Sequence, residues 1–250
     1  MTIDTATLSK TGGRRNNQDS FGCEVNQRTG CWVVADGLGG HAGGETASRM
    51  AVDAVLSVFR QTKSVSPEII DAGFFQAHQA IQQKATEDFS LSAMRTTLTV
   101  LICDEQQAVW GHVGDSRLYW FRNGKILYQT KDHSVPQMLV DAGKITPAEI
   151  RGHEEQNRLT RAVGQEGVLR ATIVSEPVPL QSGDAALLCS DGIWNYILET
   201  EMEDDWAAAN STAEYLDLLE RRVLARATGE HDNYTAVAVR FQGVLTHDKN

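Results

Sequence analysis

The sequence has 250 residues, which is enough for one large domain or two small ones with a sizeable core. Hydrophobic residues make up 41% of it and charged residues 22%, a composition typical of soluble globular proteins. The formal net charge of −10 argues against nucleic acid or an anionic membrane as the main partner, and it suits a protein that gathers carboxylates around cations.

The four cysteines, Cys23, Cys31, Cys103 and Cys189, form no C-x-x-C pair, which disfavours a zinc site. Three of them lie in or beside apolar runs, so we expect inert core residues in a reduced, intracellular protein. The first ten residues contain no apolar signal region, and no stretch approaches the length of a membrane span. The sequence therefore predicts a cytoplasmic protein with no membrane partner.

The first half of the chain predicts a strand followed by two helices. The apolar run CWVVA at 31–35 is typical of a buried strand, and it leads into the glycine-rich stretch DGLGGHAGGE at 36–45. A helix is expected from near Gly44 to about Gln61. A second helix should begin at Ser66-Pro67, a capping residue followed by proline at the first helical position.

The hydrophobic pattern then becomes that of strands, at 96–104, 108–113 and 117–129. The last of these contains Asn123-Gly124, a strong hairpin signal. Residues 130–160 are polar and irregular, with short helical pieces announced by Ser134-x-Pro136 and Thr146-Pro147.

Strands return at 185–190 and 234–242, and between them a helix opens with the capping box Ser211-x-x-Glu214 and stops at Gly229. Helices thus come as a pair and then singly, between runs of strands. This order favours an α+β arrangement with helices packed outside sheets, in one domain over residues 1–250.

Four aspartates lie next to predicted strands: Asp36, Asp115 and Asp191 follow one, and Asp232 precedes the last. Any single Asp-Gly is most simply a turn. If these strands are neighbours, however, the carboxylates meet at one edge of the sheets and repel unless they are neutralised. Oxygen ligands select hard cations, so the pattern indicates magnesium or manganese.

A dinucleotide-binding loop is an alternative interpretation of the glycine-rich stretch. The letters GLGGHA at 37–42 fit the dinucleotide pattern G-x-G-x-x-G/A, but that pattern requires a second strand with an acidic residue, and here a second helix is expected.

Arg14 and Arg15 in GGRRNNQDS would usually be solvated surface. Beside a metal centre, one guanidinium could bind two phosphate oxygens.

Together these motifs resemble the metal-dependent protein phosphatases of type 2C, in their compact bacterial form. The matching segments occur in order along nearly the whole chain: GRRNNQD (13–19), ADGLGGHAGGE (35–45), TTLTVL (96–101), HVGDSRLY (112–119), NRLTRAVG (157–164), GDAALLCSDG (183–192) and HDNYTAVAV (231–239).

The resemblance implies a four-layer αββα sandwich, in which two mostly antiparallel sheets are flanked by helix pairs and two manganese or magnesium ions lie at one end. By it, Asp36 bridges the ions, the carbonyl of Gly37 binds one of them, and Asp191 and Asp232 hold the other. It also implies that Asp19 contacts metal-bound water. Asp115 looks like the ligand of a third, weaker ion.

The resemblance also bears on three residues outside the set of metal-binding aspartates. Arg14 would bind the substrate phosphate. His41 matches a histidine proposed to protonate the leaving group, although it could equally order the loop. Gln18 stands where many members have an acidic residue, so support of one ion would be weaker.

The implied reaction is hydrolysis of phosphoserine and phosphothreonine in proteins by a hydroxide that bridges the two ions. Its partners would be phosphorylated proteins and a bacterial serine/threonine kinase whose action it reverses. Residues 130–160 match the family's flap, where substrates would be selected. Two alternatives stay open: a non-catalytic phosphoprotein-binding module, which the intact set of aspartates argues against, and a hydrolase of small phosphate esters.

Overall fold

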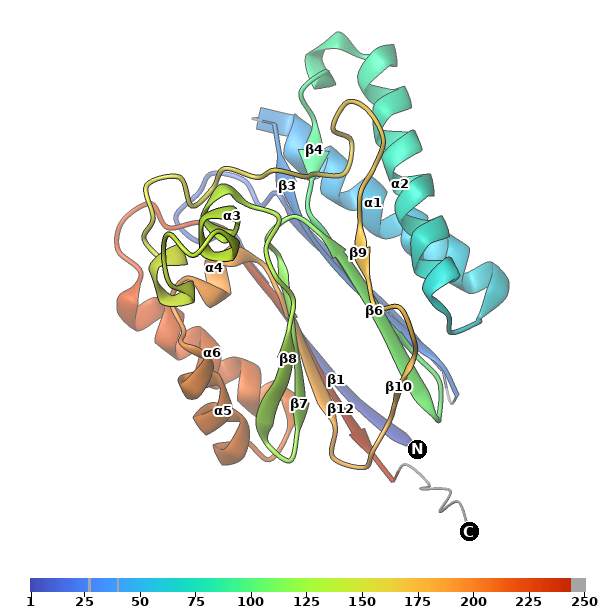
Figure 1. Cartoon of the computed structure of the whole chain (residues 1–250), viewed down its shortest axis with the longest axis vertical. Helices are drawn as coiled ribbons and strands as arrows, with labels where there is room; N and C mark the ends of the chain where they lie inside the picture. The colour runs from blue at the N-terminus through green and yellow to red at the C-terminus, as the bar shows by residue number, and fades with distance from the viewer. Residues whose placement is uncertain (27, 40, 244–250) are drawn as a thin grey trace.

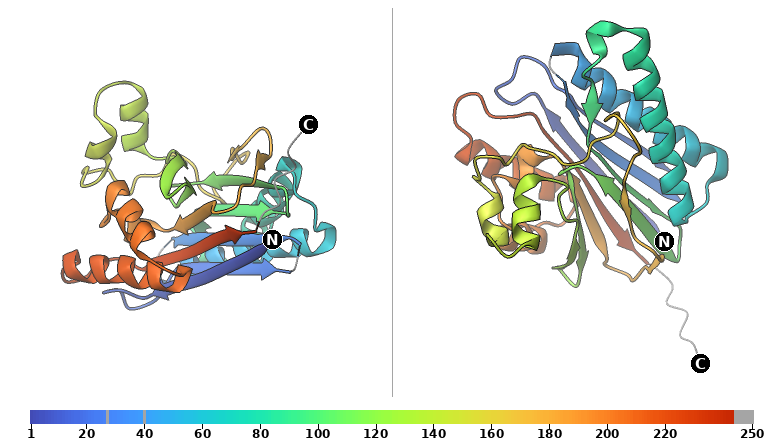
Figure 2. Two further views of the ribbon diagram at one scale, coloured as in Figure 1. Left: turned by 90° about the horizontal axis from the view of Figure 1, so that it is seen from below. Right: turned by 45° about the horizontal axis from the view of Figure 1, so that its top comes forward.

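Two β-sheets stack at the centre of the chain and helices cover their outer faces (Figure 1). The computed structural model describes residues 1–26, 28–39 and 41–243, with only the backbone of His41 and Ala42. Figure 2 shows the same layers from two further directions, with one group of helices on each side of the strands. The expected αββα sandwich is therefore confirmed.

The first sheet has five strands, and every neighbouring pair is antiparallel. Its order is β1 (Thr2–Lys10), β12 (Tyr234–Gln242), β11 (Ala185–Cys189), β7 (Arg117–Arg122) and β8 (Lys125–Gln129). The two ends of the chain thus supply neighbouring strands.

The second sheet is also antiparallel, and it contains the strand that carries Asp36. Its main path is β10 (Val178–Pro179), β6 (Gln107–Val113), β5 (Leu98–Cys103), β3 (Gly30–Leu38) and β2 (Asp19–Val25). Two short strands lie off this path: β4 (Arg95–Thr96) pairs with β3, and β9 (Thr172–Ile173) pairs with β6.

Each sheet has its own helices. The helices α1 (His41–Thr62) and α2 (Pro67–Glu87) pack on the second sheet, followed by the 3₁₀ turn η1 (Phe89–Leu91). The first sheet is covered by α4 (Asp191–Trp194), α5 (Glu199–Ala208) and α6 (Thr212–Arg226). The segment 130–160, called the flap below, contains α3 (Val135–Asp141) and η2 (Pro147–Ile150).

Large aromatic side chains fill the space between the two sheets. Trp32, Trp120 and Phe241 are completely buried there, and the rings of Trp110 and Trp120 stack with their centroids 5.1 Å apart. Burial of these rings removes much apolar surface from water, which is the main term that holds the sheets together. The ends of the strands, and the residues that follow them, are thereby fixed relative to one another.

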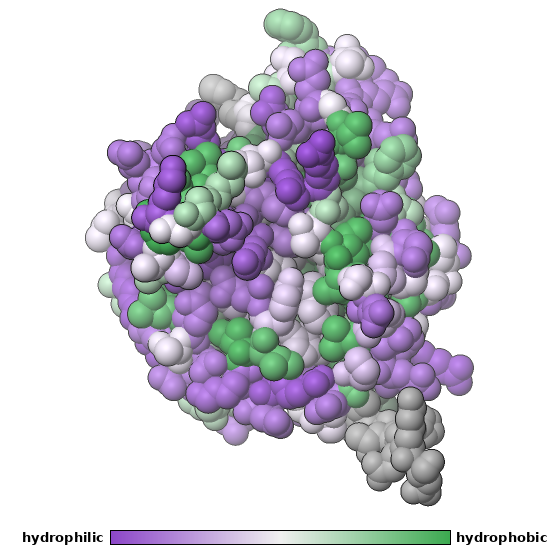
Figure 3. Space-filling model, viewed as in Figure 1, coloured by the Kyte–Doolittle hydropathy of each residue, from purple (hydrophilic) through white to green (hydrophobic). Residues whose placement is uncertain are grey.

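The surface carries no broad apolar area on the face seen in Figure 3, where hydrophobic residues form small, separate groups among hydrophilic ones. Scattered groups of this kind are ordinary on globular proteins. Among the described residues, none of the helices combines the length and apolarity that crossing a bilayer requires.

Several element boundaries differ from the sequence predictions. The first helix begins at His41 rather than near Gly44, and the last one ends at Arg226 rather than at Gly229. The helix α5 was not predicted, so the C-terminal helix is one of a pair. The predicted hairpin is confirmed, with Asn123 and Gly124 both at positive φ. Because the helix α2 follows α1 where a dinucleotide fold needs a strand, that reading is wrong.

Candidate metal centre

The predicted aspartates lie at the same end of the two sheets, carried by different elements. Asp19 begins β2 and is directly paired with Asp36 of β3 across the antiparallel register. Asp115 lies in the turn between β6 and β7, and Asp191 is the first residue of α4. Asp232 lies two residues before Tyr234, the first residue of β12.

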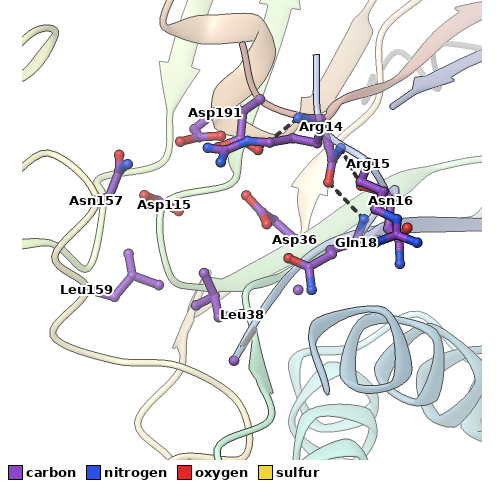
Figure 4. Close-up of a pocket in the computed structure, with 14 residues that line it drawn as sticks. Arg14, Arg15, Asn16, Gln18, Asp36, Leu38, Asp115, Asn157, Leu159 and Asp191 are labelled. Carbon is purple, nitrogen blue, oxygen red and sulfur yellow. Dashed lines mark hydrogen bonds and ion pairs between the residues drawn. The ribbon is translucent and has the colours of Figure 1, made fainter. Parts of the chain in front are cut away.

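Four of these five carboxylates line one cavity of about 440 Å³ (Figure 4), and Asp19 is the cross-strand neighbour of Asp36. Asn157 and Leu159 of the flap lie on one side in Figure 4, and Arg14, Arg15 and Gln18 lie on the other. The full set of lining residues is Arg14, Arg15, Asn16, Gln18, Asp36, Gly37, Leu38, Gly39, Asp115, Asn157, Leu159, Asp191, Asp232 and Asn233.

The electrostatics of the cavity oppose full ionisation of these groups. Desolvation raises the pKa of Asp36 well above its usual range, and the charges of Asp19 and Asp191 raise it further. The pKa of Asp191 is also raised well above its usual range, mainly by desolvation and next by the charge of Asp115. Burial also raises the pKa of Asp19 to about 6 and that of Asp115 to about 7. Burial and mutual repulsion thus oppose simultaneous ionisation of these carboxylates unless a cation neutralises them.

Two buried oxygen atoms show where such neutralisation is needed. Within the part of the chain that the structure describes, the Oδ1 atoms of Asp19 and Asp191 have no hydrogen-bond partner, although buried carboxylate oxygens are normally satisfied. Among the described residues, no three aspartate, glutamate, histidine or cysteine side chains converge closely enough to hold a metal ion as they stand. The donors nevertheless fit hard divalent cations, since all are oxygens and they repel one another.

Arg14 supplies the nearest positive charge, and it is already engaged. Its Nη2 donates to Oδ2 of Asp232 at 3.0 Å, in an ion pair whose side chains are 50% and 40% exposed. Arg15 also lines the cavity but makes no such pair among the described residues. The sequence predicted Arg14 as a phosphate ligand, whereas here it neutralises a carboxylate.

Hydroxyl groups hold the aspartates in place. Oγ of Ser190 donates to Oδ2 of Asp19 at 2.7 Å. The backbone N–H of Asp36 donates to Oγ1 of Thr97, which lies 2.7 Å from Oγ of Ser116, next to Asp115. These last two contacts connect β3, the residue between β4 and β5, and the β6–β7 turn, so the aspartates are held by a network that their motifs alone did not reveal.

Gly37 is required by close packing of backbones. A Cβ atom there would lie 2.1 Å from the carbonyl oxygen of Gly44 in α1 and 2.6 Å from that of Gln18. Both approaches are sterically impossible, so any larger residue would separate β3 from the helix. Two glycines of the motif thus allow α1 to pack directly against the strand that carries Asp36.

Comparison with known proteins gives matches over nearly the whole chain. The family model for protein phosphatase 2C matches residues 9–230. The serine/threonine phosphatase Stp of Listeria welshimeri is 34% identical over 232 residues, which is 90% of each chain. The solved structure of Stp1 from Staphylococcus aureus aligns with a TM-score of 0.88 and 27% identity over 97% of this chain and 96% of that one.

The chain belongs to the protein phosphatase 2C family. A solved structure of another member, the catalytic domain of PstP with two manganese ions, aligns with a TM-score of 0.82 and 30% identity over 96% of this chain and 99% of that one. Two manganese ions in that relative agree with the oxygen-rich, cation-poor cavity described above.

Within this member of the family, the cavity contains residues that the sequence did not single out. Asn157 and Leu159 come from NRLTRAVG, a motif that begins in the predicted flap, but neither residue was expected to line the metal cavity. Asn233 follows Asp232 and binds the arginine-bearing loop: its Oδ1 accepts from the backbone N–H of Gln18, and its Nδ2 donates to the carbonyls of Thr11 and Asn16.

The predicted role of His41 as a proton donor stays a prediction, because its side chain lies outside the described residues.

The cysteines of this phosphatase-family chain have raised thiol pKa values because they are buried, to about 11 for Cys23 and about 12 for Cys103. Cys31 and Cys189 are shifted upward as well. Thiols of this kind are poor nucleophiles, and Cys31, Cys103 and Cys189 are the three buried cysteines that match the expected inert core residues, whereas Cys23 is partly buried.

Proposed function

We propose that the protein is a metal-dependent serine/threonine phosphoprotein phosphatase. The observation that carries this proposal is the cavity in which aspartates with raised pKa values and two unsatisfied buried carboxylate oxygens gather beside an arginine. Such a site is short of positive charge and adjoins a phosphate-binding side chain. Names of similar proteins, such as the serine/threonine phosphatase Stp, support the substrate class.

The proposed ligands are those of the resemblance. Asp36 and the carbonyl of Gly37, with Asp191 and Asp232, would hold two manganese or magnesium ions, and Asp115 a third, weaker one. Asp19 would hold water next to Asp36. When bound, the ions would act as Lewis acids that acidify water and neutralise phosphate charge.

The chain's own residues would then orient the phosphate. A cation at Asp232 would take over the neutralisation that Arg14 now provides, and the Arg14 guanidinium would be free for two phosphate oxygens. The backbone N–H groups at the start of α1, which follows the cavity residues Leu38 and Gly39 in the chain, would favour an anion. His41 is the proposed donor of the proton to the departing serine or threonine oxygen.

The proposal also covers the domain organisation, the role of the flap and the place of the protein in the cell. We place residues 1–250 in one catalytic domain, in which the flap contributes Asn157 and Leu159 to the cavity and selects among phosphorylated proteins. A serine/threonine kinase whose products are hydrolysed here would be the functional counterpart, in the cytoplasm.

A comparison of three substrates tests the proposal against its alternatives. The purified protein with manganese should hydrolyse a phosphothreonine peptide with a higher kcat/KM than p-nitrophenyl phosphate, and should leave bis(p-nitrophenyl) phosphate intact. A preference for the small esters would indicate the alternative hydrolase. Tight peptide binding without phosphate release would indicate a binding module.

A further inference from the structure

The indole of Trp194 connects two of the proposed metal ligands. Trp194 ends the short helix α4, whose first residue is Asp191. Its Nε1–H donates to the backbone carbonyl of Asp115 at 2.9 Å, a contact between residues 79 positions apart. The residue is 1% exposed, so water cannot replace this bond.

The indole is itself held firmly from the side of the flap. The guanidinium carbon of Arg117 lies 3.6 Å from the centroid of its ring, a close cation–π contact. Arg117 is fixed in turn by Asp132 of the flap, through two hydrogen bonds of 2.8 Å. Nε of Arg151, also in the flap, donates to the carbonyl of Trp194 at 2.8 Å.

The other side of the Asp115 turn is also constrained. The N–H of Gly114 donates to Nδ1 of His133 at 3.2 Å, and the carbonyl of Gly114 accepts from the N–H of His133 at 2.9 Å. These contacts join the turn to the flap and not to α4. The bond from Trp194 therefore sets the distance between the Asp115 turn and the helix that begins with Asp191.

We propose that Trp194 is a positioning residue that holds the carboxylates of Asp115 and Asp191 at a fixed separation and thereby sets the affinity of the weak ion between them. The inference rests on the proposed function, in which both aspartates bind metal. A purely structural role would only stabilise the core, in which Trp194 packs with its neighbours of α5 and α6.

The test is manganese binding to Trp194→Phe, which removes the N–H donor and keeps an aromatic face under Arg117. Calorimetric titration of EDTA-stripped protein should show the weakest manganese step weakened roughly tenfold, as for other residues that orient metal ligands, with the tighter steps within about twofold of the unaltered protein. The manganese concentration for half-maximal phosphopeptide hydrolysis should rise by the same factor.

Trp206→Phe is the matched control. Trp206 is also a buried indole beneath an arginine, with Arg240 at 4.4 Å, and it packs on Phe121 and Tyr215 away from the cavity. This variant should lower the melting temperature and leave manganese binding unchanged. In an Asp115→Ala background, Trp194→Phe should have no further effect on the titration, because its route to the ion has been removed.

Three results would overturn the inference: a manganese titration of Trp194→Phe like that of Trp206→Phe, an undiminished effect in the Asp115→Ala background, or no weak manganese step in the unaltered protein. If Trp194→Phe does not fold, 3-benzothienylalanine at this position replaces the N–H by sulfur within the same outline. Should the unaltered protein hydrolyse no phosphopeptide, the proposed function fails, while the calorimetry still decides the role of Trp194.

Discussion

At the scale of single residues, three aspartates in or beside the cavity are constrained by different neighbours. Asp19 accepts from the hydroxyl of Ser190, and Asp36 is held through its backbone by Thr97. Asp232 is neutralised by Arg14 in a largely exposed ion pair. Substitutions in and around the cavity should therefore have different effects. Arg14→Ala should mainly weaken phosphate binding, and Asp115→Ala should mainly weaken metal binding.

Arg14→Ala should raise the KM for a phosphopeptide at least several-fold, because the guanidinium is the proposed phosphate ligand. Manganese affinity should change by less than about fivefold, and toward tighter binding, since an exposed ion pair contributes at most about 1 kcal/mol and Arg14 competes with the cation at Asp232. Steady-state kinetics with a manganese titration measure both. Arg15→Ala is the control and should change neither, and the reverse ranking of the two arginines would refute the assignment.

Asp115→Ala should fold, retain the two tight ions and require more manganese for activity, because an ion held by so few carboxylates is weak. Asp36→Ala, in contrast, should lose both tight metal binding and turnover. Activity measured over a range of manganese concentrations distinguishes them. If Asp115→Ala keeps the manganese activation curve of the unaltered protein and only melts at a lower temperature, Asp115 serves the turn and not an ion.

At the scale of elements, the flap is attached to the sheet by a buried ion pair. Arg117 of β7 and Asp132 are 3% and 1% exposed in their side chains, and the guanidinium binds both carboxylate oxygens. Another flap pair, Lys131 with Asp141, is 3.4 Å long and its side chains are 76% and 55% exposed. The two pairs allow a matched comparison.

Asp132→Ala should lower the free energy of unfolding by about 3–5 kcal/mol, because it removes both short hydrogen bonds of a buried guanidinium and leaves Glu199, at 3.6 Å, as its acidic partner. Asp141→Ala should cost no more than about 1 kcal/mol, since its pair is exposed and screened. Urea unfolding of both variants provides the values. Equal losses in the two variants would mean that the Arg117–Asp132 pair does not anchor the flap.

The elements also show what the sequence could and could not predict. The strands β5 and β11 are buried on both faces, so their apolar runs were evident. The strand β1 has a single fully buried residue, Leu8, and α5 buries only three residues, so neither gave a clear hydrophobic pattern. The strand β1 forms because it packs against β12, and the helix α5 because it packs against α6. Local sequence does not encode these tertiary contacts.

In the candidate site, too, the sequence predicted some features and missed others. Asp36, Asp115, Asp191 and Asp232 were predictable because each lies close to an apolar run, whereas Asp19 was expected only because its motif matched a known family. The contacts that position them join residues distant in sequence, such as Trp194 with Asp115 or Asn233 with Asn16. No local pattern marks such pairs. Arg14 was placed in the right cavity, but its ion pair with Asp232 appears only in three dimensions.

At the scale of the whole molecule, the cavity makes stability depend on metal and on pH. Asp19 and Asp115 have pKa values of about 6 and about 7 in the folded, metal-free protein, above the usual 3.8, because burial disfavours their charged forms. Folded protein therefore holds more protons than unfolded protein between about pH 4 and pH 7. These two groups thus contribute stability at low pH that is lost as the pH rises through 6 to 7.

Manganese should reverse that loss, because a cation binds only the deprotonated carboxylates. The rise in melting temperature caused by manganese, relative to EDTA, should be small at pH 5.5 and larger at pH 8. Scanning calorimetry of the same preparation in both conditions measures the difference. A manganese effect that is equal at the two pH values, or larger at pH 5.5, would contradict the account of the carboxylates.

The most direct test of the account is phosphate release from a phosphothreonine peptide before and after metal removal. Protein in manganese should release phosphate, excess EDTA should abolish the release, and added manganese or magnesium should restore it without refolding, as the aspartates of the cavity require. Metal content is determined on the same samples by mass spectrometry. Undiminished phosphate release from protein shown to contain no metal would contradict the claim that these aspartates form a catalytic metal centre.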